Sequence, residues 1–292
     1  MPASLEKNSF CKVNLLLNIL GRRADGFHEL ETLMHPVQLH DELTFSVTAS
    51  GIELTCNDPQ LPVDSRNLVY RAAEAFFGAS GRPAGVRIHL EKRIPQAAGL
   101  GGGSGNAATT LLGLNELFDS PLGSEQLHEL AAALGSDVPF FLQTRPALAT
   151  GRGENVTSLD AFAAMRGAAF FLIHPGFGIA TAWAYQNLAR FPEALNGHPG
   201  RAQRLIQLLQ TADLPAAGVD FYNSLEAPAL EKYPILRLFQ DFLRENGAAA
   251  TLMSGSGSTT FALVTSPGRA EQLAEKFKGK FGASSWLAIV PV

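Results

Sequence analysis

Two absences narrow the class of protein before any motif is considered. The 292 residues include only two cysteines, Cys11 and Cys56, which are too few for a disulfide framework or a metal site built from thiolates. No stretch approaches the ~18 uninterrupted apolar residues of a membrane-spanning helix, and the first residues have no apolar core of signal-peptide length. We therefore expect a cytoplasmic protein with no membrane partner.

An excess of charge of either sign is also missing. The chain has 23 Lys and Arg against 27 Asp and Glu, a net charge of −4, and no basic cluster of the kind that binds nucleic acid. Apolar residues make up 46% and charged residues 17%, which is typical of a compact globular protein. We expect no nucleic-acid partner, and a monomer or a weak homodimer.

Hydrophobic periodicity predicts strands and helices that are intermixed without regular alternation. Strand patterns cover 13–20, 43–49, 52–55, 86–90, 168–173, 248–253, 259–264 and 286–290, and helical patterns cover 69–77, 107–118, 124–134, 181–190, 201–211, 228–245 and 268–280. This order favours an α+β fold over a doubly wound parallel sheet. Polar and glycine residues between 150 and 160 make the best boundary, so we expect two domains, 1–155 and 156–292.

The most informative segment runs from Pro95 to Ala108, just before a helical pattern. Glycine has no Cβ, so the backbone can curl and bring several N–H groups close to one anion. The start of the helix adds free amides and the positive end of its dipole. The segment therefore predicts a phosphate-binding loop. Its glycines are Gly99, Gly101, Gly102, Gly103 and Gly105.

Other interpretations of this loop fit less well. A flexible linker of this composition is rarely placed between a strand pattern and a helix pattern. A Walker A loop needs a lysine after the glycines, and none is there. A dinucleotide fingerprint needs glycine where Ser104 stands, directly after the first strand. The signatures of protein kinases, His-Arg-Asp and Asp-Phe-Gly, are absent.

The loop, Pro95-x-x-x-Gly99-Leu100-Gly101-x-x-Ser104-x-Asn106-Ala107-Ala108, resembles the ATP loop of the GHMP kinases, the family named for galactokinase, homoserine kinase, mevalonate kinase and phosphomevalonate kinase. The segments 11–15 with 21–30, 135–141 and 253–259 match in order and resemble one bacterial branch. That branch acts in the non-mevalonate route to isoprenoid precursors, and its acceptor alcohol carries cytidine diphosphate. The resemblance implies two α+β domains, an N-terminal one like ribosomal protein S5 and a C-terminal ferredoxin-like one, with the active site between them.

The resemblance also assigns roles in transfer of the ATP γ-phosphoryl group to a hydroxyl, with Mg²⁺. Asp137 would orient and deprotonate the hydroxyl, and Lys12 would pair with Asp137 and offset phosphoryl charge. A helix cap before Pro139 is the alternative for Asp137, and a strand-edge surface lysine is the alternative for Lys12. Ser104 is a candidate Mg²⁺ or β-phosphate contact. The ATP segment comprises Pro95, Gln96, Ala97, Ala98, Gly99, Leu100, Gly101, Gly102, Gly103, Ser104 and Gly105, and the C-terminal glycine motif comprises Gly255, Ser256 and Gly257.

For the acceptor, the resemblance implies a base site. Phe27 and Tyr185 would stack on the two faces of cytosine while His28 binds its polar edge. Asn14 lies two residues after Lys12, on the same strand face, and would contact the acceptor end of the substrate. Thr181 is a further expected substrate-binding residue. A tyrosine on the buried face of a helix is the alternative for Tyr185.

Two other functions remain open: a GHMP kinase for homoserine or a mevalonate derivative, and a non-catalytic ATP-binding regulator. The segment 25–28 disfavours the first, because those substrates carry no base. Presence of both Lys12 and Asp137 disfavours the second. The chain also departs from the branch's usual pattern, with Phe10 and Cys11 in place of Pro-Ala, Gly105 in place of serine and Phe27 in place of tyrosine.

Overall fold

The computed structural model describes residues 4–82, 85–211 and 213–292. The chain forms two compact units that interleave along the sequence. The first unit contains the chain up to Cys11, Leu39–Pro95 and Gly101–Thr144, and the second contains Lys12–Gln38, Gln96–Leu100 and Arg145–Val292. Within the described ranges, no helix is long and apolar enough to cross a membrane.

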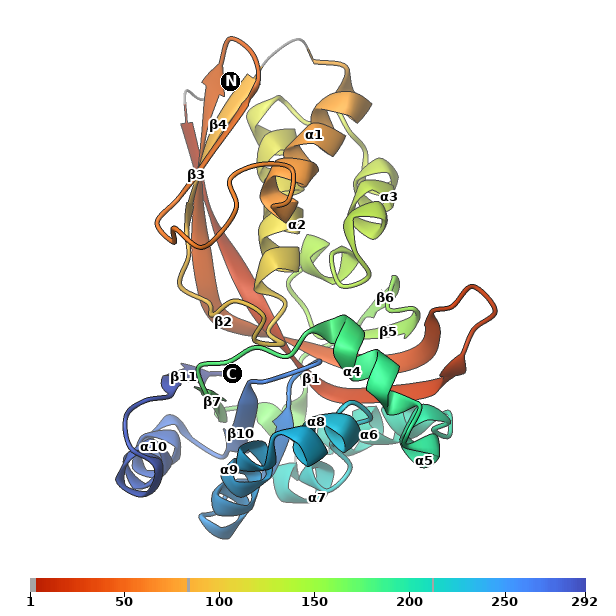
Figure 1. Ribbon diagram of the computed structural model, residues 1–292, viewed down its shortest axis with the longest axis vertical. Helices are drawn as coiled ribbons and strands as arrows, with labels where there is room; N and C mark the ends of the chain where they lie inside the picture. Colours follow the sequence, from red (N-terminus) through yellow and green to blue (C-terminus); the bar gives the residue numbers. More distant parts are fainter. Residues whose placement is uncertain (1–3, 83–84, 212) are drawn as a thin grey trace. The chain divides into compact units, whose positions relative to one another are not determined.

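In the first unit, three helices pack on one side of a sheet (Figure 1). Strand β4 pairs antiparallel with the end of β2, with Leu43 opposite Leu90, and parallel with β3, with Leu54 opposite Ile88. Phe45, Phe76 and Leu114 are among the buried side chains of this core. The elements are β2 (His28–Thr48), β3 (Ile52–Cys56), β4 (Gly85–Glu91), α1 (Leu68–Ser80), α2 (Gly102–Leu117), α3 (Ser124–Leu134) and the 3₁₀ helix η1 (Pro139–Leu142).

The second unit contains a four-stranded antiparallel sheet in the order β11-β7-β10-β9. Helices α9 and α10 pack on it through a core that includes Phe171, Phe239 and Phe277. Chain order β-α-β-β-α-β with this strand order is the ferredoxin-like arrangement that the resemblance implies. The elements are β7 (Ala169–His174), α9 (Pro234–Glu245), β9 (Ala250–Met253), β10 (Thr260–Val264), α10 (Pro267–Phe281) and β11 (Trp286–Pro291).

A seven-stranded sheet has the order β3-β4-β2-β1-β8, with β5 paired to β2 and β6 paired to β5. Its strands β1 and β2 each contribute residues to both units. The remaining elements are β1 (Ser4–Arg22), β5 (Ala147–Gly151), β6 (Asn155–Ser158), η2 (Ala163–Met165), α4 (Thr181–Leu188), α5 (Pro192–Leu195), α6 (Arg201–Gln210), α7 (Leu214–Gly218), β8 (Tyr222–Asn223) and α8 (Glu226–Lys232).

The α+β class is confirmed, and the differences from the sequence patterns have physical reasons. The single helix predicted over 228–245 is two helices, α8 and α9, divided at Tyr233. Pro234 causes the break, because proline lacks the N–H of a continuing helix and restricts the residue before it. The hairpin β5–β6 fills most of the segment in which we place the domain boundary; the boundary stays a prediction.

Candidate active site

The first part of the predicted ATP segment is hydrogen-bonded to residues that flank the C-terminal glycine motif, within the second unit. The carbonyl of Gly99 accepts hydrogen bonds from Lys12 Nζ (3.0 Å) and Ser254 Oγ (2.9 Å). The Thr259 amide donates to the Ala98 carbonyl (3.1 Å). Gly99 has φ +77°, and a Cβ there would lie 2.0 Å from the Ser254 carbonyl oxygen. Only glycine fits this position.

Lys12 lies on β1 with 2% of its surface exposed. Its ammonium donates to Asn14 Oδ1 as well as to Gly99, and its backbone amide donates to the Leu100 carbonyl (3.0 Å). Asn14 is itself fixed, because its Nδ2 donates to Thr32 Oγ1 (2.8 Å) and its amide donates to Ser254 Oγ (3.3 Å). A buried cation needs such oxygens, so the alternative of a surface lysine is wrong.

The C-terminal glycine motif lies directly against Lys12 and Asn14. A Cβ on Gly255 would be 3.2 Å from Lys12 Nζ and 3.4 Å from Asn14 Oδ1. The buried Asn223 holds this turn, since its Nδ2 donates to the Met253 carbonyl (2.7 Å) and the Gly255 carbonyl (2.8 Å). The sequence gives no signal for Asn223, which occupies a strand of two residues.

Two further predicted residues meet at the same turn. The Ser256 and Thr181 hydroxyls are 3.0 Å apart, and Thr181 is the first residue of α4. The Gly257 amide donates to the Ser254 carbonyl (2.9 Å) and closes the turn. The second unit therefore brings together Lys12, Asn14, Gly99, Thr181, Gly255 and Ser256 in one connected network.

The rest of the predicted ATP segment begins α2, in the first unit. Gly101, at φ +69°, is the N-cap, and its lack of a side chain leaves no side-chain cap on the helix. The first turn carries no acidic residue; within it Gly103 is exposed, Ser104 is half-buried and Gly105 is buried. Amides at such a helix start can bind an anion, and the helix dipole favours it.

Asp137 lies between α3 and η1 and is half-buried. The N-cap of η1 is Val138, whose side chain forms no cap bond, and both roles considered for Asp137, the catalytic base and the helix cap, stay predictions. Asp137 belongs to the first unit and Lys12 to the second. Their pairing stays a prediction.

The predicted base-binding residues begin at the turn between β1 and β2. The Arg23 amide donates to the Phe27 carbonyl (2.8 Å), and the Phe27 amide donates to Asp25 Oδ1 (3.1 Å). Phe27 is 51% exposed. The guanidinium carbon of Arg152 lies 4.8 Å from the centre of the Phe27 ring, an attractive cation–π geometry. Arg152, on the β5–β6 turn, was not predicted from the sequence.

His28 and Tyr185 lie together, with ring centres 5.0 Å apart and planes inclined by 37°. Burial, aided by the positive charge of Arg22, lowers the pKa of His28. The imidazole is therefore neutral at physiological pH and can offer one donor and one acceptor to a base edge. The stacking of a base by Phe27 and Tyr185 stays a prediction.

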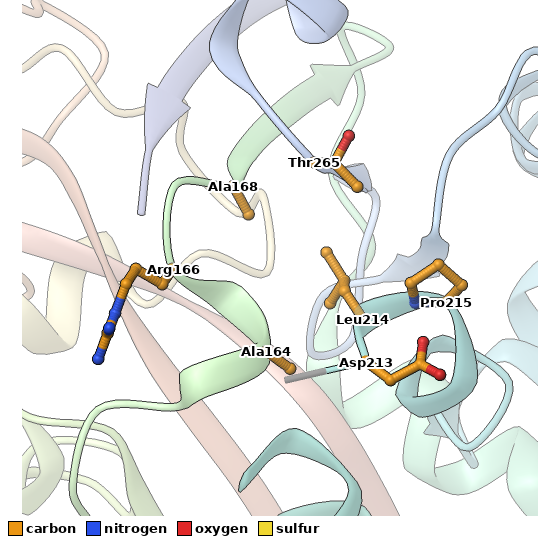
Figure 2. Close-up of a pocket in the computed structure, with 7 residues that line it drawn as sticks. All are labelled: Ala164, Arg166, Ala168, Asp213, Leu214, Pro215 and Thr265. Carbon is orange, nitrogen blue, oxygen red and sulfur yellow. The ribbon is translucent and has the colours of Figure 1, made fainter. Parts of the chain in front are cut away.

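One cavity of about 300 Å³ lies elsewhere in the second unit (Figure 2). Its Asp213 carboxylate already caps α7 by accepting from the Ala216 amide (3.0 Å), and the Arg166 side chain extends away from the other labelled residues. None of the predicted site residues lines it; the lining residues are Ala164, Arg166, Ala168, Asp213, Leu214, Pro215 and Thr265. Among the described residues, no group of three or more His, Cys, Asp or Glu side chains could hold a metal ion.

Two family models match the chain. Residues 67–145 match the GHMP kinases N terminal domain, and residues 192–283 match the GHMP kinases C terminal domain. The first matched range includes Gly101–Ser104, at the start of α2, and Asp137, which follows α3. The second includes Asn223, which donates a hydrogen bond to Gly255 of the C-terminal glycine motif. The chain belongs to the GHMP kinases, a class of small-molecule kinases.

The similar proteins are more specific. The chain is 42% identical, over 93% of its length and 93% of the relative's, to the 4-diphosphocytidyl-2-C-methyl-D-erythritol kinase of Syntrophus aciditrophicus. A crystal structure of a 4-(cytidine 5'-diphospho)-2C-methyl-D-erythritol kinase is 37% identical and superposes with a TM-score of 0.81, over 99% of this chain and 100% of that one. Within the GHMP kinases, the chain therefore belongs with the 4-diphosphocytidyl-2-C-methyl-D-erythritol kinases.

A more distant solved structure has the same fold. The homoserine kinase of Cytophaga hutchinsonii is 20% identical and superposes with a TM-score of 0.78, over 100% of this chain and 96% of that one. The two folds are alike, but at this identity the likeness does not extend to the substrate.

Proposed function

We propose that this protein transfers the γ-phosphoryl group of ATP to the 2-hydroxyl of 4-diphosphocytidyl-2-C-methyl-D-erythritol, giving the 2-phosphate and ADP. The reaction belongs to the non-mevalonate route to isoprenoid precursors. The relatives' names support the substrate. The observation that carries the chemistry is the buried Lys12 ammonium, which is fixed to Gly99 of the glycine loop and to Asn14.

The ATP phosphates would bind at the glycine loop. The start of α2 supplies amides and a positive dipole end, and the loop contains no cationic side chain of its own. Lys12 supplies positive charge where negative charge develops on the phosphoryl group. Mg²⁺ would offset the remaining phosphate charge; the hydroxyl of Ser104 is half-buried in the first turn of α2 and is the oxygen type that this ion prefers.

The acceptor hydroxyl would be deprotonated and oriented by Asp137, the carboxylate within the segment that resembles the family's catalytic one. Asn14 would contact the acceptor end of the substrate. At the other end, Phe27 and Tyr185 would stack on cytosine while the neutral His28 reads its edge. Arg152, held over the face of Phe27, would fix that ring.

A kinase acting on homoserine or mevalonate is the second candidate, because the fold is shared with such enzymes. The aromatic side chains of Phe27, His28 and Tyr185 favour an acceptor that carries a nucleobase. We further propose that the enzyme is cytoplasmic, that it is a monomer or weak homodimer, and that its domain boundary lies near residue 155.

The test is an assay of the purified protein with ATP, Mg²⁺ and a panel of alcohols, in which ADP is measured and the product is identified by mass. The panel contains the cytidine diphosphate-linked methylerythritol, homoserine and mevalonate. We expect a phosphorylated product from the first alone. Turnover of homoserine or mevalonate without turnover of the cytidylyl alcohol supports the second candidate.

A further inference from the structure

A buried carboxylate outside the proposed catalytic groups fastens the glycine loop. Asp41 lies on β2 with none of its surface exposed. One of its oxygens accepts from the amides of Arg93 (2.8 Å) and Ile94 (2.9 Å). The other accepts from Lys92 Nζ (2.5 Å) and Asn106 Nδ2 (2.9 Å). All of these residues belong to the first unit.

The four donors lie on both sides of the predicted ATP segment. Arg93 and Ile94 come directly before Pro95, its first residue, and Asn106 directly follows Gly105, its last. One side chain on a strand far away in the sequence therefore holds both stems of the loop. Asn106 also donates to Ser9 Oγ (2.9 Å), so the second stem is fixed in the same place by a further bond.

The chemistry of this position calls for an ionised carboxylate. A carboxylate only accepts hydrogen bonds and has room for four of them, which matches the four donors around Asp41. An asparagine would point its NH₂ group at donors, and an apolar residue would take the acceptor away from the amides of Arg93 and of the buried Ile94. The Lys92 side chain, 7% exposed, compensates the buried charge.

The ion pair of Asp41 and Lys92 also lies beside the glycine loop. A Cβ on Gly102, the first residue of α2, would lie 3.1 Å from Lys92 Nζ. The carboxylate thus holds an ammonium beside the same helix start whose amides are available to phosphate.

We propose that Asp41 is a positioning residue for ATP. It holds the two stems of the glycine loop at a fixed separation, and it keeps Lys92 beside Gly102, so that the amides and the ammonium converge on the phosphates. This role rests on the proposed function, in which the loop binds ATP.

The test compares Asp41→Asn with Asn115→Ala by steady-state kinetics and thermal unfolding. Asn115 is a matched control at the other end of α2, where its side chain bonds both the amide and the carbonyl of Leu122. We expect Asp41→Asn to raise KM for ATP about tenfold and to leave KM for the acceptor alcohol within about twofold. Asn115→Ala lowers the melting temperature but leaves KM for ATP unchanged.

A second variant covers the case in which Asp41→Asn does not fold. Asn106→Ala releases only the second stem, so we expect KM for ATP to rise about threefold without an effect on the acceptor. An unchanged KM for ATP in the folded variants contradicts the role of Asp41. The role is also contradicted if the Asp41 variant raises KM for ATP and KM for the acceptor equally. It is contradicted as well if Asn115→Ala raises KM for ATP as much as Asp41→Asn does.

Gly102→Val separates this proposal from the ATP site itself. If Gly102→Val weakens ATP binding and the Asp41 and Asn106 variants do not, the loop binds ATP and the role of Asp41 is wrong. If Gly102→Val leaves ATP binding unchanged as well, the assignment of the loop is wrong, and the proposal for Asp41 is refuted with it.

Discussion

Lys12 donates a hydrogen bond from its buried ammonium to the carbonyl of Gly99, over 3.0 Å. The bond ties a cation on the first strand to the loop that would hold ATP. The same carbonyl accepts from Ser254, the residue directly before the C-terminal glycine motif, so this turn helps to fix the carbonyl that binds the cation. Any change at Lys12 therefore acts on charge and loop geometry together.

Lys12→Met should lower kcat about 100-fold or more, because the charge that offsets the transferring phosphoryl group is lost. The fold should persist, since methionine keeps the apolar stem and Gly99 still accepts from Ser254. Steady-state kinetics with a melting curve checks both statements. Near-normal turnover would remove Lys12 from the mechanism.

Asp137→Asn should lower kcat by at least about 100-fold with little change in ATP binding, as expected for a positioned general base. The double variant with Lys12→Met should lose less kcat than the product of the two single losses if the residues act as one unit. Strictly multiplicative losses would count against the Lys12–Asp137 pair.

Gly102→Val should raise the dissociation constant of ATP. Valine's methyl groups would stand over the first amides of α2, where even a Cβ lies 3.2 Å from Ile94 Cγ2. Gly268→Val is the control: Gly268 is in the first turn of α10 and has nothing within 4 Å of a Cβ. Calorimetry should show weaker ATP binding in the first variant and parental affinity in the second; parental affinity in both means that the phosphates bind elsewhere.

Gly105→Ser restores the residue usual in this branch but should destabilise this chain. A Cβ at residue 105 would lie 2.7 Å from the Phe10 carbonyl and 3.2 Å from Ser9 Oγ, and overpacking of this kind costs about 1–3 kcal/mol. Gly103→Ser is the control, because its nearest neighbour, Leu68 Cδ1, is 3.7 Å away. Urea unfolding of both variants measures the difference, and equal midpoints would show that the Phe10 segment moves aside freely.

His35 should make the fold less stable in acid. Burial lowers its pKa from 6.5 to about 4, and its ring packs on Phe162 and Phe170. Between these values the unfolded chain binds a proton that the folded chain does not, so stability falls as the pH is lowered from 6.5 towards 4, by about 3 kcal/mol in all. Unfolding of His35→Phe across this range should show a flatter profile. A profile as steep as the parent's would assign the acid sensitivity to other groups.

Sequence patterns predicted the alternating strand β4 and the fully buried, apolar strand β7, but they missed most of β2. Residues 86–90 alternate between buried and exposed positions in β4, which is the pattern that identifies a strand. In β2, residues 30–35 are all buried although Glu31, Thr32 and His35 are polar. The sequence there shows neither alternation nor a continuous apolar run, so the strand was predicted only near its end.

The site likewise contains residues that were predicted from the sequence and residues that were not. Motif residues such as Lys12, Gly99 and Gly255 were predicted, and the structure brings them together. Asp41 could not be predicted, because its donors come from residues about fifty and sixty-five positions away and nothing around it in the sequence marks it as paired. The contact of Arg152 with Phe27 likewise depends on the pairing of β5 with β2.

The central claim is that the acceptor is recognised by its cytosine, and the most direct measurement compares kcat/KM for the cytidylyl substrate and its uridylyl analogue. Cytosine offers an N4 donor and an unprotonated N3, while uracil offers an O4 acceptor and an N3–H, so the wrong base leaves buried partners unmatched. In kcat/KM we expect about a ten- to hundredfold preference for the cytidylyl substrate, and His28→Ala should reduce this preference. Phe27→Ala and Tyr185→Ala should weaken the binding of both substrates and leave the binding of ATP unchanged. Equal kcat/KM for the two bases in the parent enzyme would contradict the account.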